Sequence, residues 1–336
     1  MKDKTIGNQT VFFANRPKII STYTVAGPKE GLSLFAKYFD LTLKRDDWKT
    51  TSYEKAERKM LEHAIYNAID RAKLKTSDID VLLSGDLLNQ ITTSSFAARQ
   101  FDTTFIGLFG ACSTMAESMA LGACLVDAKY FGTVACATGS HFSSVERQFR
   151  YPLELGTQRP PTAQWTVTGA GCCILSSSGA GPVVSMATFG KVTDYGVVDA
   201  NNMGAAMAPA AMTTLLAHFN NTKTKPDDYD LIATGDLGKL GSEILIELME
   251  NKGVKLEQNY MDCGHAIFSH SQKSFQGGSG CGCSALMFNS FIIDRIKKGI
   301  YKKVLLVATG ALMSPTSSFQ GETIPAIAHA VVVENK

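Results

Sequence analysis

A cysteine opens the least polar helix that this sequence predicts. Cys112 lies in segment 110–122, Gly-Ala-Cys-Ser-Thr-Met-Ala-Glu-Ser-Met-Ala-Leu-Gly, whose residues are almost all small or apolar. A helix without a polar face is buried inside a domain, so its first turn must open onto protein or a pocket. The helix dipole and free backbone N–H groups would favour a thiolate there, as in a nucleophile. The simpler alternative is a cysteine that acts as a small buried apolar side chain.

A loop of small residues could supply the second part of a site. Residues 277–280 read Gly-Gly-Ser-Gly, so that backbone N–H groups would be accessible at Gly278, Ser279 and Gly280. Such groups, together with the helix at Cys112, could hold a carboxylate much as helix termini bind phosphate. The pattern predicts a pocket for a small anion.

Five polar side chains are further candidates. His265 and His270 precede the glycine loop and could donate to a carboxylate, although a single histidine more often has a structural role. Asp236 ends a predicted strand, where a turn role is equally open. Glu117 lies inside the apolar helix, so it needs a polar network or a pocket wall. Arg159 is a secondary candidate for binding a dicarboxylate or a partner.

Metal and nucleotide sites find little support. The possible zinc ligands are Cys263, His265, His270, Cys281 and Cys283. Their spacing lacks the usual C-x₂₋₄-C knuckle, and we expect no metal. Residues 280–285 match G-x-G-x-x-A, but no acidic residue follows about 20 positions later, as a dinucleotide site requires. We therefore expect no cofactor.

The composition is that of an ordinary globular protein. The chain has 336 residues, of which 45% are apolar and 19% charged, and its net charge is +2. This balance leaves no electrostatic footprint for nucleic acid. The eight cysteines lie mostly in apolar runs, as reduced thiols do. No apolar run approaches about 18 residues, so we expect no transmembrane helix.

An internal repeat organises the elements around the cysteine. The helix predicted over 52–73, the turn at 75–80 and the strand at 81–86 have counterparts at 208–219, 225–230 and 231–236, with an offset of 225 − 75 = 150. The strand ending at Gly139 matches that ending at Gly310, with an offset of 310 − 139 = 171. The second offset predicts a twin of the apolar helix at residues 283–298.

The repeat predicts an α/β fold of two pseudo-symmetric halves, each with a mainly parallel sheet and with the two apolar helices together between the sheets. We place the halves at residues 1–180 and 181–336. The first half contains an insertion at 27–48 and a loop at 141–165.

These residues resemble a known fold and a known family. Gly110–Ser113 at the mouth of a buried helix, Thr-Gly-Ala-Gly-Cys-Cys-Ile-Leu at 168–175 and the glycine loop resemble the thiolase and ketoacyl-synthase fold. Over nearly all its length the chain resembles the stage V sporulation protein AD family of spore-forming bacteria. The resemblance implies a homodimer that binds dipicolinic acid, alone or as its calcium chelate, for uptake into the developing spore and release at germination. It also implies a peripheral place on the spore inner membrane through other stage V A proteins.

The resemblance also bears on catalysis. A condensing enzyme needs a thiolate, donors for the oxyanion, and a histidine or a His/Asn pair to move protons. The resemblance places the proton-transfer histidine at Asp236 and the second catalytic residue, a histidine or asparagine, near 277–280. Neither position has the required side chain. We therefore expect binding without turnover. Acyl transfer through Cys112 and a pure scaffold for membrane partners are the alternatives.

Overall fold

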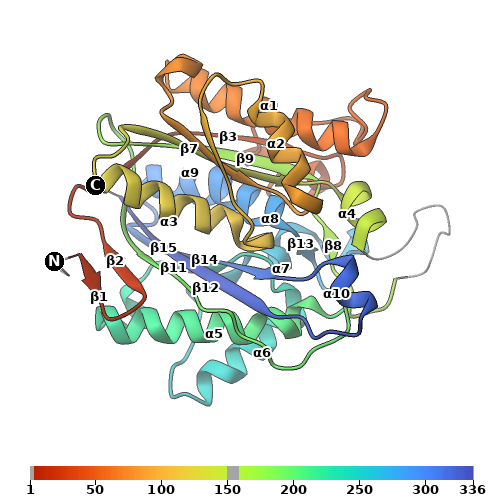
Figure 1. Cartoon of the computed structure of the whole chain (residues 1–336). Coiled ribbons are helices and arrows are strands. Elements are labelled where there is room, and N and C mark those ends of the chain that lie inside the picture. The colour runs from red at the N-terminus through yellow and green to blue at the C-terminus, as the bar shows by residue number, and fades with distance from the viewer. Residues whose placement is uncertain (1–3, 150–158, 336) are drawn as a thin grey trace.

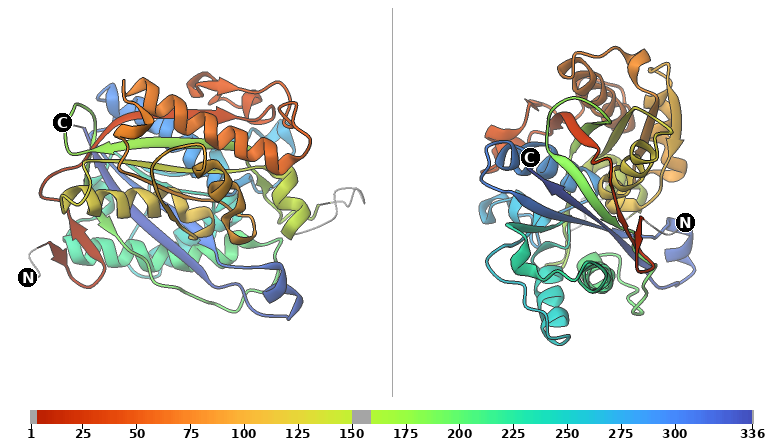
Figure 2. Two further views of the ribbon diagram at one scale, coloured as in Figure 1. Left: turned by 45° about the horizontal axis from the view of Figure 1, so that its top comes forward. Right: turned by 90° about the vertical axis from the view of Figure 1, so that its left-hand side faces the viewer.

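The computed structural model describes residues 4–149 and 159–335 and stacks helices and sheets in five layers. Helices α1 (Tyr53–Arg71) and α2 (Thr92–Ala98) cover one outer face, and α5 (Met203–Thr222) and α6 (Gly238–Glu250) cover the opposite one (Figure 1). Between the sheets lie α3 (Thr114–Asp127) and the helices near residue 290. Figure 2 shows the same layers from two further directions. The arrangement confirms the α/β fold and the central position of the apolar helices.

The remaining elements belong to the two halves of the layered structure. Those of the first are β1 (Thr5–Ile6), β2 (Thr10–Phe12), β3 (Lys18–Ala26), β4 (Leu41–Thr42), β5 (Val81–Gly85), β6 (Thr104–Gly107), β7 (Thr133–Ser140), α4 (Phe142–Phe149), β8 (Trp165–Thr166) and β9 (Gly169–Ser176). Those of the second are β10 (Val183–Thr188), β11 (Leu231–Thr234), β12 (Tyr260–Asp262), α7 (Cys263–Ile267), β13 (Gly278–Ser279), α8 (Cys281–Met287), α9 (Ile293–Lys297), β14 (Lys303–Ala311), α10 (Pro315–Phe319) and β15 (Ala326–Glu334).

The strand order shows the pseudo-symmetry directly. One half runs β6-β5-β7-β9-β3 and the other β12-β11-β14-β15-β10, and they join where Val183 pairs with Lys18. In each half the first three strands are parallel, and the next two pair antiparallel. The parallel part has the helical crossovers that the sequence predicted. The antiparallel strands extend each half toward the junction.

Two equivalent aspartates fix the start of the central strands. Asp80 accepts hydrogen bonds from the backbone N–H groups of Gly132 and Thr133 at 2.7 and 2.9 Å. Asp230 accepts from those of Lys302 and Lys303 at 2.7 and 2.8 Å. The offset of 230 − 80 = 150 is the one found in the sequence. Each carboxylate thereby ties the end of one turn to the first residues of the neighbouring strand.

The strand register corrects the second offset by one residue. Leu82 pairs with Ala135 in β7, and its counterpart Ile232 pairs with Leu305 in β14, which gives 305 − 135 = 170 rather than 171. A shift of one residue along a strand moves a side chain to the other face of the sheet. The structural partner of Gly110 is therefore Gly280, because 280 − 110 = 170, and the twin helix begins at Cys281 instead of Cys283.

The two central helices form the core between the sheets. Met115 and Met119 of α3 and Leu286 and Met287 of α8 are fully buried in one apolar cluster. The twin helix contains one π turn, Phe288–Ile292, between α8 and α9. This burial explains the small and apolar composition of both segments.

Two other expectations need adjustment. The first part of the expected loop 141–165 is helix α4, and the rest overlaps residues outside the described ranges. Helix α5 begins at Met203, five residues before the predicted start at 208. The insertion at 27–48 contains two short 3₁₀ helices, Glu30–Leu32 and Ala36–Tyr38, and strand β4. The long helix predicted over 52–73 is α1, with Ser52 as its N-cap.

Removing the Asp230 carboxylate should weaken the second half. In Asp230→Ala two backbone donors at the start of β14 lose their protein partner, and we expect a loss of about 1 kcal/mol in the free energy of unfolding. Urea denaturation measures this change. Asp227→Ala is the matched control, because Asp227 on the same turn forms an exposed ion pair with Lys225. An equal loss in both variants would contradict the structural role of Asp230.

Candidate functional site

Cys112 is held at a sharp turn at the mouth of α3. The residue before it, Ala111, has a φ of 49°, in the left-handed region that residues with a side chain seldom adopt. The turn is stabilised by Ser113, whose backbone N–H and hydroxyl both donate to the carbonyl of Gly110, at 3.0 and 2.6 Å. The thiol of Cys112 is only slightly exposed. The turn thus directs the side chain of Cys112 away from α3.

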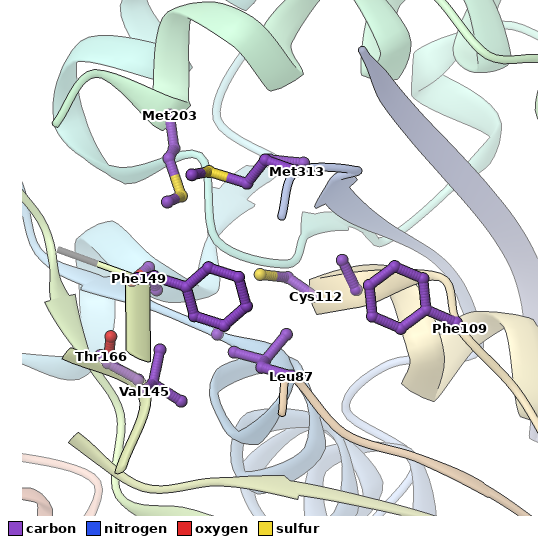
Figure 3. A pocket seen from close by; sticks show the side chains of 12 residues that line it. Leu87, Phe109, Cys112, Val145, Phe149, Thr166, Met203 and Met313 are labelled. Atoms are coloured by element: carbon purple, nitrogen blue, oxygen red, sulfur yellow. The ribbon is translucent and has the colours of Figure 1, made fainter. Parts of the chain in front are cut away.

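That side chain enters a small apolar pocket (Figure 3). Its volume of about 30 Å³ is room for about two water molecules. In Figure 3 the thiol lies between Phe149 and Phe109, with Leu87 on one side and Met203 and Met313 on the other. The remaining wall residues are Ala111, Val145, Thr166, Ser279, Gly280 and Ala311. No lysine or arginine is among the described residues that line it.

A wider cleft adjoins this pocket. Its volume is about 490 Å³, and it shares Leu87, Phe109, Phe149 and Met313 with the pocket at Cys112. The rest of its wall is formed by the apolar residues Leu88, Ile91 and Leu312 and by the polar residues Asn89, Gln90, Ser314 and Ser317. The cleft has room for a small ring compound, and the narrow pocket at Cys112 lies beside it.

Asp236 links Cys112 to the second half of the chain. Its buried carboxyl group accepts hydrogen bonds from the backbone N–H of Gly280 at 2.8 Å and the hydroxyl of Thr309 at 2.9 Å, and it is hydrogen bonded to the thiol of Cys112. Burial raises its pKa to about 7. The equivalent Asp86 instead accepts from the backbone N–H groups of Leu88 in the following loop and of Ser94 in α2. Asp236 therefore has a role that its counterpart lacks.

The surroundings keep the thiol of Cys112 protonated. Burial raises its pKa well above the usual range, and the negative charge of Asp236 and the neighbouring Cys281 raise it further. The N–H of Gly280 acts in the opposite direction but is the weaker influence. A neutral thiol is a poor nucleophile. The favourable effect of the helix dipole, expected from the sequence, is therefore outweighed.

The glycine loop reaches the pocket with only part of its length. Ser279 and Gly280 line the pocket, and the buried hydroxyl of Ser279 has no hydrogen-bond partner in the described structure. Gly278 faces the core, since a Cβ there would lie 2.8 Å from Ile267 and 2.9 Å from Val167. The N–H of Gly280 is occupied by Asp236. The expected cradle of free backbone donors is thus not formed, and Ser279 supplies the available polar group.

Three of the other candidates lie away from the pocket. His265 and His270 are exposed and line a different cavity. Arg159 is paired with Glu146 at 2.9 Å and also donates to the carbonyl of Gln164. Glu146 in turn accepts a hydrogen bond from the hydroxyl of Thr166, which lines the pocket. Arg159 therefore lies behind the pocket wall.

Glu117 packs against the turn that holds Cys112. A Cβ on Gly110 would lie 2.4 Å from one of its carboxyl oxygens, and the backbone of Gly110 is hydrogen bonded to this carboxyl group. Burial raises the pKa of Glu117 to about 7. The oxygen nearest to that Cβ position has no hydrogen-bond partner in the described structure, and Glu117 is not among the residues that line the pocket.

Sequence reasoning missed most of the pocket wall. Leu87, Phe109, Val145, Phe149, Met203 and Met313 are ordinary apolar residues on five separate segments, and no local pattern marks them. Of these six, only Leu87 could have been noticed in the sequence, because the pair Asp86-Leu87 matches Asp236-Leu237 in the repeat. Within residues 4–149 and 159–335 no three His, Cys, Asp or Glu side chains are placed to hold a metal ion.

Comparison with solved structures identifies the fold. OleA of Xanthomonas campestris superposes with a TM-score of 0.62 at 10% identity, over 96% of this chain and 99% of that one. The 3-oxoacyl-[acyl-carrier-protein] synthase III of Aquifex aeolicus gives 0.55 at 13% identity, over 95% and 99%. An OleA structure with bound lauric acid and lauroyl-CoA gives 0.59 at 11% identity, over 95% and 99%. These enzymes share the thiolase-like fold, and at such low identity they show the fold alone.

Comparison of sequences is more specific. The sequence model of the family stage V sporulation protein AD matches residues 7–334. The stage V sporulation protein AD of Bacillus subtilis (strain 168) is 44% identical over 331 residues, which cover 98% of each chain. Among the described residues, no helix is both long and apolar enough to cross a membrane. This sporulation protein with a thiolase-like fold belongs to the stage V sporulation protein AD family.

Proposed function

We propose that this protein binds dipicolinate at the mouth of α3 without converting it, for uptake into the developing spore and release at germination. The observation that carries the proposal is the pairing of Cys112 with Asp236 beside the unpartnered hydroxyl of Ser279. A thiol held neutral is unsuited to acyl transfer, whereas a buried polar group without a partner favours a bound ligand.

The shape of the site suits a ring with a polar edge. The ring would lie in the wider cleft against Leu87, Phe109 and Met313, since the cleft volume of about 490 Å³ admits it. The recess of about 30 Å³ admits only one carboxylate group or water. A carboxylate oxygen there would accept a hydrogen bond from Ser279. Burial of the flat ring supplies most of the favourable free energy.

The charge of Asp236 sets a condition on this binding. A carboxylate ligand near an ionised Asp236 is repelled, and repulsion in a poorly hydrated site is strong. Burial raises the pKa of Asp236 to about 7, so this group is largely neutral in mildly acidic solution. The ligand is therefore best accepted when Asp236 is protonated, or when a calcium ion accompanies the dicarboxylate and reduces its charge.

The assembly of the protein belongs to the same proposal. We propose that it works as a homodimer and that other stage V A proteins hold it at the spore inner membrane. Membership of the sporulation family supports this arrangement. A catalytic alternative, acyl transfer through Cys112, has the thiolase-like fold in its favour but lacks a histidine next to the thiol, where Asp236 stands.

Filling the pocket should abolish binding of dipicolinate at Cys112. Val145→Trp places a large side chain into the recess from α4, and isothermal titration calorimetry should then lose the binding event that belongs to this pocket. Ser279→Ala removes only the unpartnered hydroxyl, and we expect affinity to fall about fivefold, the effect of one hydrogen bond.

Ser290→Ala is the matched control for these variants. Ser290 is a buried serine whose hydroxyl donates to the carbonyl of Leu286 in the twin helix. It does not line the pocket, so its loss should leave the affinity unchanged. If Ser279→Ala and Val145→Trp fold and bind dipicolinate as the wild type does, the site is elsewhere.

The affinity for dipicolinate should fall as the pH rises through about 7. Asp236 is neutral below its raised pKa and negative above it, while the ligand remains a dicarboxylate throughout this range. Between pH 6 and 8 we expect a loss of up to about tenfold, which corresponds to about 1.4 kcal/mol of repulsion. In Asp236→Asn the affinity should be nearly constant. A wild-type affinity independent of pH would contradict a charge contact between Asp236 and the ligand.

Cys112 should form no acyl adduct. Wild-type protein incubated with acyl-coenzyme A should keep its mass, because the protonated thiol of Cys112 attacks thioesters slowly. Intact-mass spectrometry measures this, with Cys112→Ser as the control for adducts on other thiols. An adduct that depends on Cys112 and turns over would show that the protein is an acyltransferase.

A further inference from the structure

A second cavity lies between the start of α6 and the segment that leads into β13. Its volume is about 450 Å³. The lining residues are Lys239, His265, Phe268, Ser269, His270, Lys273, Ser274, Phe275, Gln276 and Gly277. None of them lines the pocket at Cys112. Strand β13 separates the two spaces, with Gly277 on one side and Ser279 and Gly280 on the other.

Four basic side chains surround this cavity without a compensating carboxylate. They are Lys239, His265, His270 and Lys273, and no aspartate or glutamate is among its described lining residues. Within the described part of the chain, none of the four forms an ion pair or a side-chain hydrogen bond. The two lysine ammonium groups beside one hollow repel each other and concentrate anions there. The cavity thus has the electrostatics of an anion site.

Two acidic groups lie nearby, outside the lining of this cavity. Glu243 and Asp262 line a neighbouring hollow that shares Lys239 and His265 with the cavity. The carboxyl group of Asp262 already has hydrogen-bond partners. It accepts from the hydroxyl of Thr234 and from the backbone N–H groups of Leu237, Gly238 and His265. Glu243 lies one turn after Lys239 on α6, but the two form no ion pair.

The wall of the cavity also offers flat apolar surface. Phe268 is mostly buried, whereas Phe275 is 49% exposed. Lys273 and Phe275 have φ values of 52° and 53°, in the left-handed region that is costly for residues with a side chain. Such strain is retained where the surrounding structure imposes it, often at ligand sites. The strained backbone fixes the direction in which Phe275 projects.

The loop that carries these residues is anchored rather than loose. Lys29 donates its ammonium group to the carbonyl of Gln272 at 2.6 Å, and the side-chain amide of Gln272 donates to the carbonyl of Lys29 at 2.7 Å. Gln276 accepts from the backbone N–H of Leu240 at 3.0 Å, which ties the loop to α6. The positions of Lys239 and Lys273 relative to Phe275 are therefore set before any ligand arrives, which lowers the entropic cost of binding.

We propose that this cavity is a second binding site, which takes a small organic anion with a flat ring and two or more negative charges. Lys239 and Lys273 hold the charged groups, His265 and His270 donate further hydrogen bonds, and the ring stacks on Phe275. Both a free aromatic dicarboxylate and a nucleoside diphosphate have this chemistry. The site stands independently of the binding proposed at Cys112.

Charge reversal tests this second site. Calorimetric titrations of the wild type use pyridine-2,6-dicarboxylate, adenosine diphosphate and inorganic phosphate as separate probes. In Lys239→Glu/Lys273→Glu we expect the affinity at this site to fall about 100-fold or more, because two charge-assisted contacts become repulsive. Phe275→Ala should weaken the two ring compounds and leave phosphate unchanged.

The control keeps the change in net charge the same. Lys252→Glu/Lys255→Glu reverses two exposed lysines just beyond the far end of α6. It should bind each probe as the wild type does. If pyridine-2,6-dicarboxylate binds more tightly than adenosine diphosphate, the ligand is an aromatic dicarboxylate. The reverse order indicates a nucleoside diphosphate. The inference is overturned if neither ring compound binds the wild type, or if the two double variants bind it equally. Val145→Trp leaves this second site intact, so failure at Cys112 is seen separately.

Discussion

One buried carboxyl group connects the parts of this structure that matter for its chemistry. Asp236 follows β11 and contacts the residue before α8, Thr309 near the end of β14 and the thiol at the mouth of α3. A buried carboxyl group is costly unless it is hydrogen bonded, so these contacts must form together. The position of Cys112 in the first half is thereby set by groups of the second half. The site exists only when both copies of the repeat are packed.

The same carboxyl group also acts on the protonation of the Cys112 thiol. In a condensing enzyme the group beside the thiol must take up a proton and leave a thiolate. Burial is the main cause of the raised pKa of Cys112, and a carboxylate in that place raises it further because it opposes the charge of a thiolate. The apolar wall of Phe109, Phe149 and Met313 adds to this effect, because it withholds the water that would solvate an anion.

The fold could be predicted from the sequence because buried helices and strands require apolar residues at regular positions. The equivalent turns before Asp80 and Asp230 gave the first offset correctly, and the apolar composition of 110–122 placed its helix between the sheets. The second offset was wrong by one residue, since only hydrogen-bond register distinguishes neighbouring positions in a strand. The candidate site was harder to predict from the sequence. Composition does not reveal that the N–H of Gly280 is already occupied, or that α7, capped by Asp262, leaves His265 exposed.

The repeat offers two helix mouths, and packing explains why, among the described residues, only the one at Cys112 opens onto a pocket. The counterpart of Cys112 is Gly282, where a Cβ would lie 2.6 Å from the carbonyl of Gly169. Next to it, Cys281 donates its thiol to the carbonyl of Gly139 at 2.9 Å and is fully buried. The second mouth is therefore closed by the first half of the chain. At Cys112 the left-handed turn at Ala111 directs the side chain outward instead, so that duplication followed by asymmetric packing leaves a single recess.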